Sequence, residues 1–166
     1  SKLREIDLQL SQLSLQFGEN VLAETQAFQL HLTEEKDLSG LPEGAIEAAH
    51  LLAKSQDKEG WIFTLDHPSY IPFVTYADNR ELRKKMSIAF GSKAFQNNEF
   101  DNQEIVLNIA KLRFDRAQLL GYKTHAHYVL EERMAQTPEQ VISFLNDLLE
   151  KAKPAAQKEF EELTTF

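Results

Sequence analysis

Residues 2–32 read KLREIDLQLSQLSLQFGENVLAETQAFQLHL, and this stretch contains both of the backbone periods that set the fold class. Its first part carries large apolar side chains three or four residues apart, at Leu3, Ile6, Leu10, Leu13 and Phe17. That spacing places one apolar stripe along an amphipathic helix, which we expect to cover about residues 2–27. From residue 28 the period changes to two, because apolar and polar residues alternate up to residue 32, as in a half-buried strand.

A second run of β-branched and aromatic residues, WIFTL at positions 61–65, is the other strand candidate. With two such runs in the chain, the economical arrangement pairs them across the helix that lies between them. The predicted fold is therefore mainly α: a multi-helix array with one small two-stranded antiparallel sheet, about 28–32 with 61–65. We expect Trp61 to lie at the junction of this sheet with the helices and its ring to be buried.

The rest of the chain is predicted to be helical. Asp or Thr is followed three residues later by Glu or Gln at Asp78–Glu81, Asp101–Glu104 and Thr137–Gln140, a pattern typical of capping boxes. Thr124 can cap a further short helix, and Pro154 is expected to kink or interrupt the last one near residue 153. The predicted helices cover about 42–58, 66–76, 79–96, 102–120, 124–134 and 138–166.

Composition and charge exclude several classes of protein. Of 166 residues, 42% are hydrophobic and 27% are charged, which is ordinary for a folded globular chain. The formal net charge of −8 argues against nucleic acid or an anionic membrane as the partner. The sequence contains no cysteine, which excludes disulfides, thiolate catalysis and Cys-ligated metal sites. Together with the shortness of the apolar runs, this pattern predicts a cytoplasmic protein.

Histidines are the remaining candidates for metal ligands, and their spacing does not form a zinc motif. A helical zinc-peptidase site needs His-Glu-x-x-His, and no such sequence occurs in the chain. His127 with Glu131, and His31 with Glu35, could each share a helical face, but two ligands are more typical of a surface pair. We therefore predict no metal site and no catalytic residue in this stretch. The five histidines are His31, His50, His67, His125 and His127.

Other chemistry has little support in the residue pattern. Asp66, His67 and Ser69 lie too close in sequence for a Ser-His-Asp relay and are typical of a helix start. The sequence has no glycine-rich phosphate loop, dinucleotide-binding turn or nucleophile elbow. Two groups stay open to a structural or a functional interpretation, and we favour the structural one for both. They are the basic cluster Arg80, Arg83, Lys84 and Lys85, as a solvated helix face or an anion site, and the aromatic group Trp61, Phe63, Tyr70, Phe73 and Tyr76, as core or as a groove lining.

Several stretches, taken in order along the chain, resemble one family of enzymes. They are LSQLS at 10–14, NVL at 20–22, GLP at 40–42, LDHPSY at 65–70, YADNRELR at 76–83, LLGY at 119–122 and MAQTPE at 134–139. Together they are similar to the N-terminal half of the thimet-oligopeptidase-like zinc metallopeptidases, which include oligopeptidase A and the bacterial peptidyl-dipeptidases. None of these stretches is chemically diagnostic alone, so the resemblance depends on their order along essentially the whole chain.

This resemblance implies a much longer, mostly helical enzyme whose two lobes enclose a deep channel that admits short peptides. In that family the zinc ligands and the general base lie on a His-Glu-x-x-His helix and a further Glu, downstream of the region that this chain resembles. Residues 1–166 would then be a single helical segment of the N-terminal lobe, and zinc would be a cofactor of the parent enzyme that this stretch does not bind. Tyr70 and Tyr76, beside the most family-like stretch, are candidates for the channel wall.

The partners follow from the same interpretation. Helical periodicity is at full strength at both ends of the sequence, so we expect a piece of a longer protein. Its partners would be the remaining lobe of the same polypeptide and short peptide substrates, with no nucleic acid and no membrane. The isolated piece is expected to self-associate through an exposed apolar patch. The alternative is a stand-alone helical protein-interaction module, whose first and last helices dock a partner helix through their apolar stripes.

Overall fold

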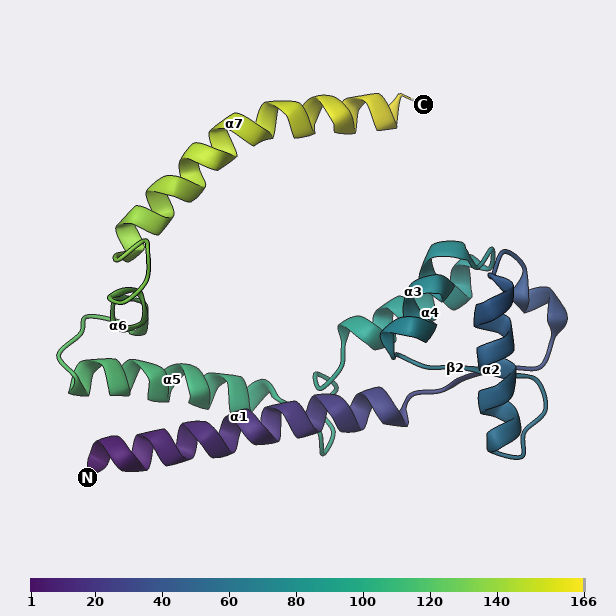
Figure 1. Cartoon of the computed structure of the whole chain (residues 1–166), viewed down its shortest axis with the longest axis horizontal. Coiled ribbons are helices and arrows are strands. Elements are labelled where there is room, and N and C mark those ends of the chain that lie inside the picture. Colours follow the sequence, from purple (N-terminus) through teal and green to yellow (C-terminus); the bar gives the residue numbers. More distant parts are fainter. Residues whose placement is uncertain (166) are drawn as a thin grey trace. The chain divides into compact units, whose positions relative to one another are not determined.

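The computed structural model describes residues 1–165, and helices dominate it (Figure 1). Within these residues the predicted fold class, mainly α with one small two-stranded antiparallel sheet, is confirmed. No helix in this range is long and apolar enough to cross a membrane. The elements are α1 Lys2–Ala27, β1 Leu30–Leu32, the 3-10 helix η1 Glu35–Leu38, α2 Glu43–Ser55, β2 Trp61–Phe63, α3 His67–Tyr76, α4 Arg80–Gly91, α5 Gln103–Leu119, α6 His125–Leu130 and α7 Pro138–Thr164.

Contacts divide the chain into two compact units, which we describe separately. The first, Ser11–Asn108, contains the two strands with α2, α3 and α4, and we call it the sheet unit. The second comprises Ser1–Leu10 and the residues from Ile109 onward, and we call it the α6–α7 unit. Helices α1 and α5 are each divided between the two units, with one end in each.

The sheet has three residues in each strand, and β1 and β2 pair antiparallel with His31 opposite Ile62 at the centre. It is therefore shorter than the predicted 28–32 and 61–65. Gly60 precedes β2 with a φ of +87°, and a Cβ at this position would lie 2.2 Å from the carbonyl oxygen of Leu32. Only glycine allows the chain to enter β2 so close to the end of β1.

The core of the sheet unit centres on two aromatic rings, Phe63 of β2 and Phe73 of α3, and both are fully buried. Their ring centroids lie 4.7 Å apart in an edge-to-face arrangement, which is a favoured geometry for aromatic pairs. Buried aliphatic and small residues surround them, namely Leu30, Leu32, Leu38, Leu41, Ala49, Leu65, Ala77 and Met86.

Trp61 corrects the predicted core. Its ring is only half-buried and packs on the edge of the core, with the His50 ring of α2 centred 6.3 Å away. Trp61 is the first residue of a three-residue strand, so the cover that buries Phe63 reaches only part of the indole. The aromatic residues at the centre of the core are therefore Phe63 and Phe73.

Helix starts follow the predicted capping residues in two places and depart from them in a third. The hydroxyls of Thr124 and Thr137 accept hydrogen bonds from the backbone N–H three residues further on, at 3.4 and 3.3 Å, which confirms both as N-caps. Helix α4 is capped by Asn79, whose Oδ1 accepts hydrogen bonds from the backbone N–H groups of Glu81 and Leu82, at 3.1 and 3.3 Å. The prediction of Asp78 as this cap was wrong, because Ser39 Oγ donates to Asp78 Oδ2 at 2.6 Å instead.

Helix α4 also ends earlier than predicted, at Gly91 and not near residue 96. Ala94 and Asn97 follow it with φ values of 56° and 54°. These left-handed conformations cannot belong to a right-handed helix, so the chain must leave the helix before them. The backbone N–H of Asn102 donates to the carbonyl oxygen of Ala94 at 2.8 Å and closes the loop that results.

The last two helices differ from their predictions in opposite ways. Helix α6 ends at Leu130, short of the predicted end at Met134. Pro154 does not interrupt α7, which stays continuous from Pro138 to Thr164 and is curved (Figure 1). A proline inside a helix removes one backbone hydrogen bond and favours a bend, and α7 has space to bend because none of its described residues is buried.

Candidate functional site

Two of the family-like segments meet in the sheet unit, where the GLP turn contacts the end of α3. We call this contact, formed by residues 37–40 and 76–83, the turn–helix junction. Gly40 has a φ of +84°, and a Cβ on it would lie 2.1 Å from the carbonyl oxygen of Tyr76. The backbone N–H of Asp78 donates to the carbonyl oxygen of Ser39 at 2.8 Å. The chain can approach this closely only because residue 40 has no side chain.

Arg83 and Asn79 complete the junction. Arg83 Nη1 donates to the carbonyl oxygens of Ala77 and Asp78, the second at 3.0 Å. Asn79 Nδ2 donates to Asp37 Oδ1 at 3.0 Å. The two bonds from Arg83 satisfy carbonyl oxygens just beyond the end of α3, which have no partner within a helix. The guanidinium of Arg83 therefore has a structural role.

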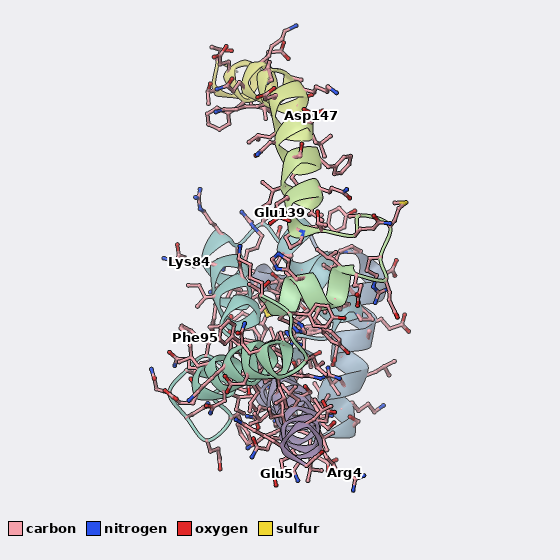
Figure 2. The ribbon with its side chains drawn as sticks, turned by 90° about the vertical axis from the view of Figure 1, so that its left-hand side faces the viewer. Arg4, Glu5, Lys84, Phe95, Glu139 and Asp147 are labelled. Atoms are coloured by element: carbon pink, nitrogen blue, oxygen red, sulfur yellow. The ribbon has the colours of Figure 1, made fainter. Side chains whose placement is uncertain are left out.

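The other members of the basic cluster, Arg80, Lys84 and Lys85, are exposed on α4. Figure 2 shows Lys84 projecting away from the ribbon. Glu81 lies among them and is exposed as well. Their arrangement supports the predicted solvated helix face more than an anion site.

The two channel-wall candidates lie in different surroundings on α3. The Tyr70 ring is stacked on Phe90 of α4, with centroids 4.1 Å apart and planes at 14°, and it packs against the core. Tyr76 is 55% exposed, and its carbonyl oxygen belongs to the turn–helix junction. Tyr76 thus has a ring that could contact another molecule, whereas much of the Tyr70 ring is already covered.

The described histidines do not converge. Within residues 1–165 no group of three or more His, Asp or Glu side chains lies close enough to hold a metal ion. In the sheet unit each histidine has a separate neighbour: His31 Nε2 lies 2.6 Å from the carbonyl oxygen of Glu59, and His50 Nδ1 lies 3.1 Å from that of Gly60. The His67 ring packs edge-to-face with Phe90, with ring centroids 5.8 Å apart. These residues do not fit a zinc site.

The predicted His–Glu pairs also form differently. His127 Nε2 lies 3.7 Å from Glu139 Oε1, and its Nδ1 lies 2.7 Å from the hydroxyl of Thr124. Glu131 accepts a hydrogen bond from the hydroxyl of Tyr122, and this contact raises the pKa of Tyr122. His127 and Glu131 are therefore not a ligand pair. Glu35 belongs to a 3-10 helix and His31 to a strand, so that pair does not share a helical face.

His125 is the one histidine with a perturbed environment in the α6–α7 unit. Its Nδ1 is buried without a hydrogen-bond partner among the described residues. The pKa of His125 is lowered below its ordinary value of 6.5, mainly by burial and to a smaller extent by the nearby guanidinium groups of Arg113 and Arg116. Arg116 itself is held by Asp7 Oδ1, 2.9 Å from its Nε, and lies over the Tyr128 ring at 5.0 Å.

This environment predicts a loss of stability on acidification. Because the folded chain keeps His125 neutral to a lower pH, the unfolded chain binds more protons once the pH falls below 6.5. Stability should fall as the pH decreases from there through the folded-state pKa and should level off below it. Thermal unfolding of the parent and of His125→Gln, between about pH 7.5 and pH 5, should show the melting temperature of the parent falling more steeply. Parallel curves for the two proteins would contradict this assignment.

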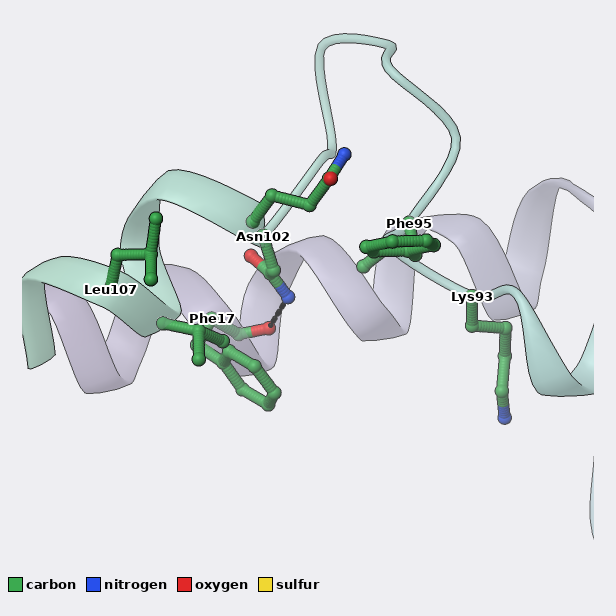
Figure 3. A pocket seen from close by; sticks show the side chains of 8 residues that line it. Phe17, Lys93, Phe95, Asn102 and Leu107 are labelled. Carbon is green, nitrogen blue, oxygen red and sulfur yellow. Dashed lines mark hydrogen bonds between the residues drawn. The ribbon is translucent and has the colours of Figure 1, made fainter. Parts of the chain in front are cut away.

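An apolar groove lies on the sheet unit (Figure 3). It encloses about 480 Å³ between the second half of α1, the start of α5 and the loop before α5. Figure 3 shows the hydrogen bond that Asn102 Nδ2 donates to the carbonyl oxygen of Phe17, with a length of 3.1 Å. The lining residues are Phe17, Lys93, Ala94, Phe95, Asn102, Gln103, Val106 and Leu107.

A buried amide pair connects α1 to the start of α5 beside this groove. Asn20 Nδ2 donates to Asn102 Oδ1 at 2.9 Å, and both side chains are buried. The sequence analysis missed this pair, although a signal was present. Asn20 and Glu24 continue the three-and-four spacing of the apolar stripe, and a polar residue at a core-facing position indicates a specific partner.

Removing one amide should therefore destabilise the sheet unit. Asn102→Ala leaves Asn20 Nδ2 and the carbonyl oxygen of Phe17 without this partner, and we expect a loss of about 1–3 kcal/mol in the free energy of unfolding. Urea unfolding of Asn20→Ala, Asn102→Ala and the double variant would give the coupling between the two side chains. Strictly additive losses would show that the two amides do not interact.

The comparisons with known proteins agree with one another. A family model described as Peptidase family M3 matches residues 73–166, which is more than half of the chain. Oligopeptidase A of Salmonella typhimurium is 40% identical over 98% of the chain, which covers 24% of that protein. Saccharolysin of Saccharomyces cerevisiae is 32% identical over 98% of the chain, which covers 22% of it. Dipeptidyl carboxypeptidase of Escherichia coli is 26% identical over 96% of the chain, which covers 24% of it.

These matches show which proteins the chain is similar to and how much of the length of those proteins it covers. The chain spans about a quarter of the length of these curated relatives. The family match begins within α3, in the stretch LDHPSY to YADNRELR that enters the turn–helix junction, and continues through α7. By this match over more than half of its residues, the chain belongs to Peptidase family M3.

Proposed function

We propose that this chain is part of a zinc-dependent metallopeptidase that cleaves short oligopeptides, and that residues 1–166 form a structural segment of its N-terminal lobe. The observation that carries the proposal is 40% identity to oligopeptidase A along 98% of the chain. The names of the relatives include both oligopeptidases and a dipeptidyl carboxypeptidase, so short peptides are the substrate class and the mode of cleavage stays open.

The geometry supports a scaffolding role for this stretch. Arg83, Asn79 and Asp78, which lie in the most family-like segment, all bind backbone or neighbouring side chains of the junction. The described histidines have separate neighbours, so we assign the zinc site and the catalytic residues to the part of the parent protein outside this chain. The proposed partners are that remaining lobe and short peptides, in the cytoplasm, with nucleic acid disfavoured by the net charge of −8.

The test uses the longer reading frame that contains these 166 residues. We expect the purified long protein to cleave a quenched fluorescent peptide of about ten residues, to lose the activity with a zinc chelator and to regain it with added zinc. A folded protein substrate should resist cleavage. Absence of cleavage in the zinc-loaded long protein, or cleavage that a chelator leaves unchanged, would contradict the proposal.

Tyr76 is the proposed contact between this stretch and substrate. Its ring is more than half exposed, so Tyr76→Ala in the long protein should raise KM for the peptide without lowering the melting temperature. Tyr70→Ala is the matched control on the same helix. Because the Tyr70 ring is stacked on Phe90, its removal should lower the melting temperature. An unchanged KM in Tyr76→Ala would exclude Tyr76 from the channel wall.

One observation favours the alternative function, a stand-alone helical interaction module. Helix α7 has no buried residue, and side chains project from it on every side (Figure 2). Its large exposed apolar side chains are Ile142, Phe144, Leu145, Leu148, Leu149, Phe160 and Leu163. The same side chains would also drive the self-association that we propose for the isolated chain. A purified chain that binds a partner helix in preference to itself would favour the module.

A further inference from the structure

We infer that the apolar groove of the sheet unit is a docking site for an apolar segment of the same polypeptide, from the part of the longer protein that this chain does not include. The inference rests on the proposed function, because it takes a protein of the length of the relatives as the parent. It goes beyond that function by assigning a surface and an occupant. The groove is the one lined by Phe17, Phe95, Val106 and Leu107 (Figure 3).

The groove combines apolar side chains with exposure. Phe95 and Leu107 are each 63% exposed, and Phe17 and Val106 are exposed beside them. A single exposed hydrophobic side chain is ordinary on a protein surface, but four around one cavity form a patch of the kind that marks an interaction site.

Hydrogen bonds hold the rim of the groove in place. The carboxylate of Glu24 in α1 accepts hydrogen bonds from the side-chain amides of Gln96 and Asn98, the first at 3.1 Å. Both donors belong to the loop before α5. Asp101 Oδ2 accepts from the backbone N–H of Asn97 at 2.6 Å. Phe95 is thus presented by a loop whose polar groups are bonded. An aromatic side chain held in position loses little conformational entropy on binding, which favours it as an anchor.

The lining of the groove and the length of the relatives favour an apolar segment of the same polypeptide as the occupant. Among the described residues that line the groove, Lys93 is the one charged side chain, so the occupant should be apolar with at most a carboxylate facing it. The relatives are about four times as long as the chain, and the match covers the groove residues, so a large part of the parent lies outside this stretch.

Labelling of introduced cysteines tests the inference, since the chain itself has none. Leu107→Cys reports on the groove, and Leu51→Cys is the matched control, because Leu51 is 57% exposed on α2 and does not line the groove. Both variants should react rapidly with a maleimide in the 166-residue chain. In the long protein, Leu107→Cys should react at least about tenfold more slowly relative to Leu51→Cys, because a covered thiol reacts only when the contact opens.

Each of the following three outcomes would overturn the inference. Equal relative rates in the two proteins would show that the groove stays uncovered. Labelling of Leu107→Cys that slows with concentration in the 166-residue chain would indicate a second copy. Protection in the long protein that arises only after addition of a short peptide would indicate a substrate. Val106→Cys replaces Leu107→Cys if the melting temperature shows that the latter has not folded.

The readout also separates this inference from the proposed function, because labelling needs no turnover. A long protein that protects the thiol at position 107 but cleaves no peptide would refute the proposed activity and leave the docking site standing. A long protein that cleaves peptides while the thiol at position 107 stays reactive would support the proposed activity and refute the docking site.

Discussion

Replacing Phe73 by alanine should lower the free energy of unfolding of the sheet unit by about 3–5 kcal/mol. The Phe73 side chain is fully buried, and its ring packs edge-to-face with that of Phe63, with centroids 4.7 Å apart. Truncation removes that contact and leaves a cavity at the point where α3 meets the sheet. Because folded domains are stable by only about 5–15 kcal/mol, a loss of this size threatens the fold.

The measurement is unfolding in urea, monitored by tryptophan fluorescence. Trp61 is the only tryptophan of the chain and lies at the edge of the same core. Ile71→Ala is the matched control on α3, where the side chain is 48% exposed and should contribute less than about 1 kcal/mol. Equal losses in Phe73→Ala and Ile71→Ala would show that the core is centred elsewhere.

Replacing Gly40 by alanine should be the most damaging change outside the core. The left-handed φ of +84° alone costs a residue with a Cβ about 1–2 kcal/mol. The added Cβ would also lie 2.1 Å from the carbonyl oxygen of Tyr76, so the turn and the end of α3 must move apart. We therefore expect a loss of about 2 kcal/mol or more, since an alanine that the backbone cannot accommodate destabilises a fold.

Gly44→Ala is a matched control with the opposite sign. Gly44 lies in α2, and a Cβ there would have no atom within 4 Å. Alanine is favoured over glycine inside a helix by up to about 1 kcal/mol, so this variant should gain stability. Urea unfolding of the two variants beside the parent measures both effects. A Gly40→Ala protein as stable as the parent would show that the turn does not approach α3 so closely.

The helices and the sheet were predictable because their signals are local. The three-and-four spacing of residues 3–17 predicted α1 with its observed bounds, and the alternation after residue 28 predicted β1. The Asp78 cap was wrong for a reason that lies 39 residues away: Ser39 binds its carboxylate, and the neighbouring Asn79 caps α4 instead. Sequence spacing cannot show which of two adjacent capping residues a distant hydroxyl will occupy.

The candidate sites were predictable only in part. The family-like segments were visible in the sequence, but their meeting at the turn–helix junction depends on the backbone contact between Gly40 and Tyr76. The aromatic group was correctly favoured as core for Phe63 and Phe73, whereas Trp61 and Tyr76 are only partly covered or exposed. The apolar groove escaped notice because Phe17 of α1 lies about 75 residues or more away in sequence from the other lining residues, which belong to α5 and the loop before it.

The central claim is that this stretch supplies structure and that the chemistry of the parent lies outside it. Zinc content and peptide turnover, measured on the 166-residue chain and on the long protein after the same zinc loading and desalting, test it directly. The account predicts that the long protein retains zinc and cleaves a short peptide, while the 166-residue chain does neither. Chelator-sensitive cleavage by the 166-residue chain alone would contradict it.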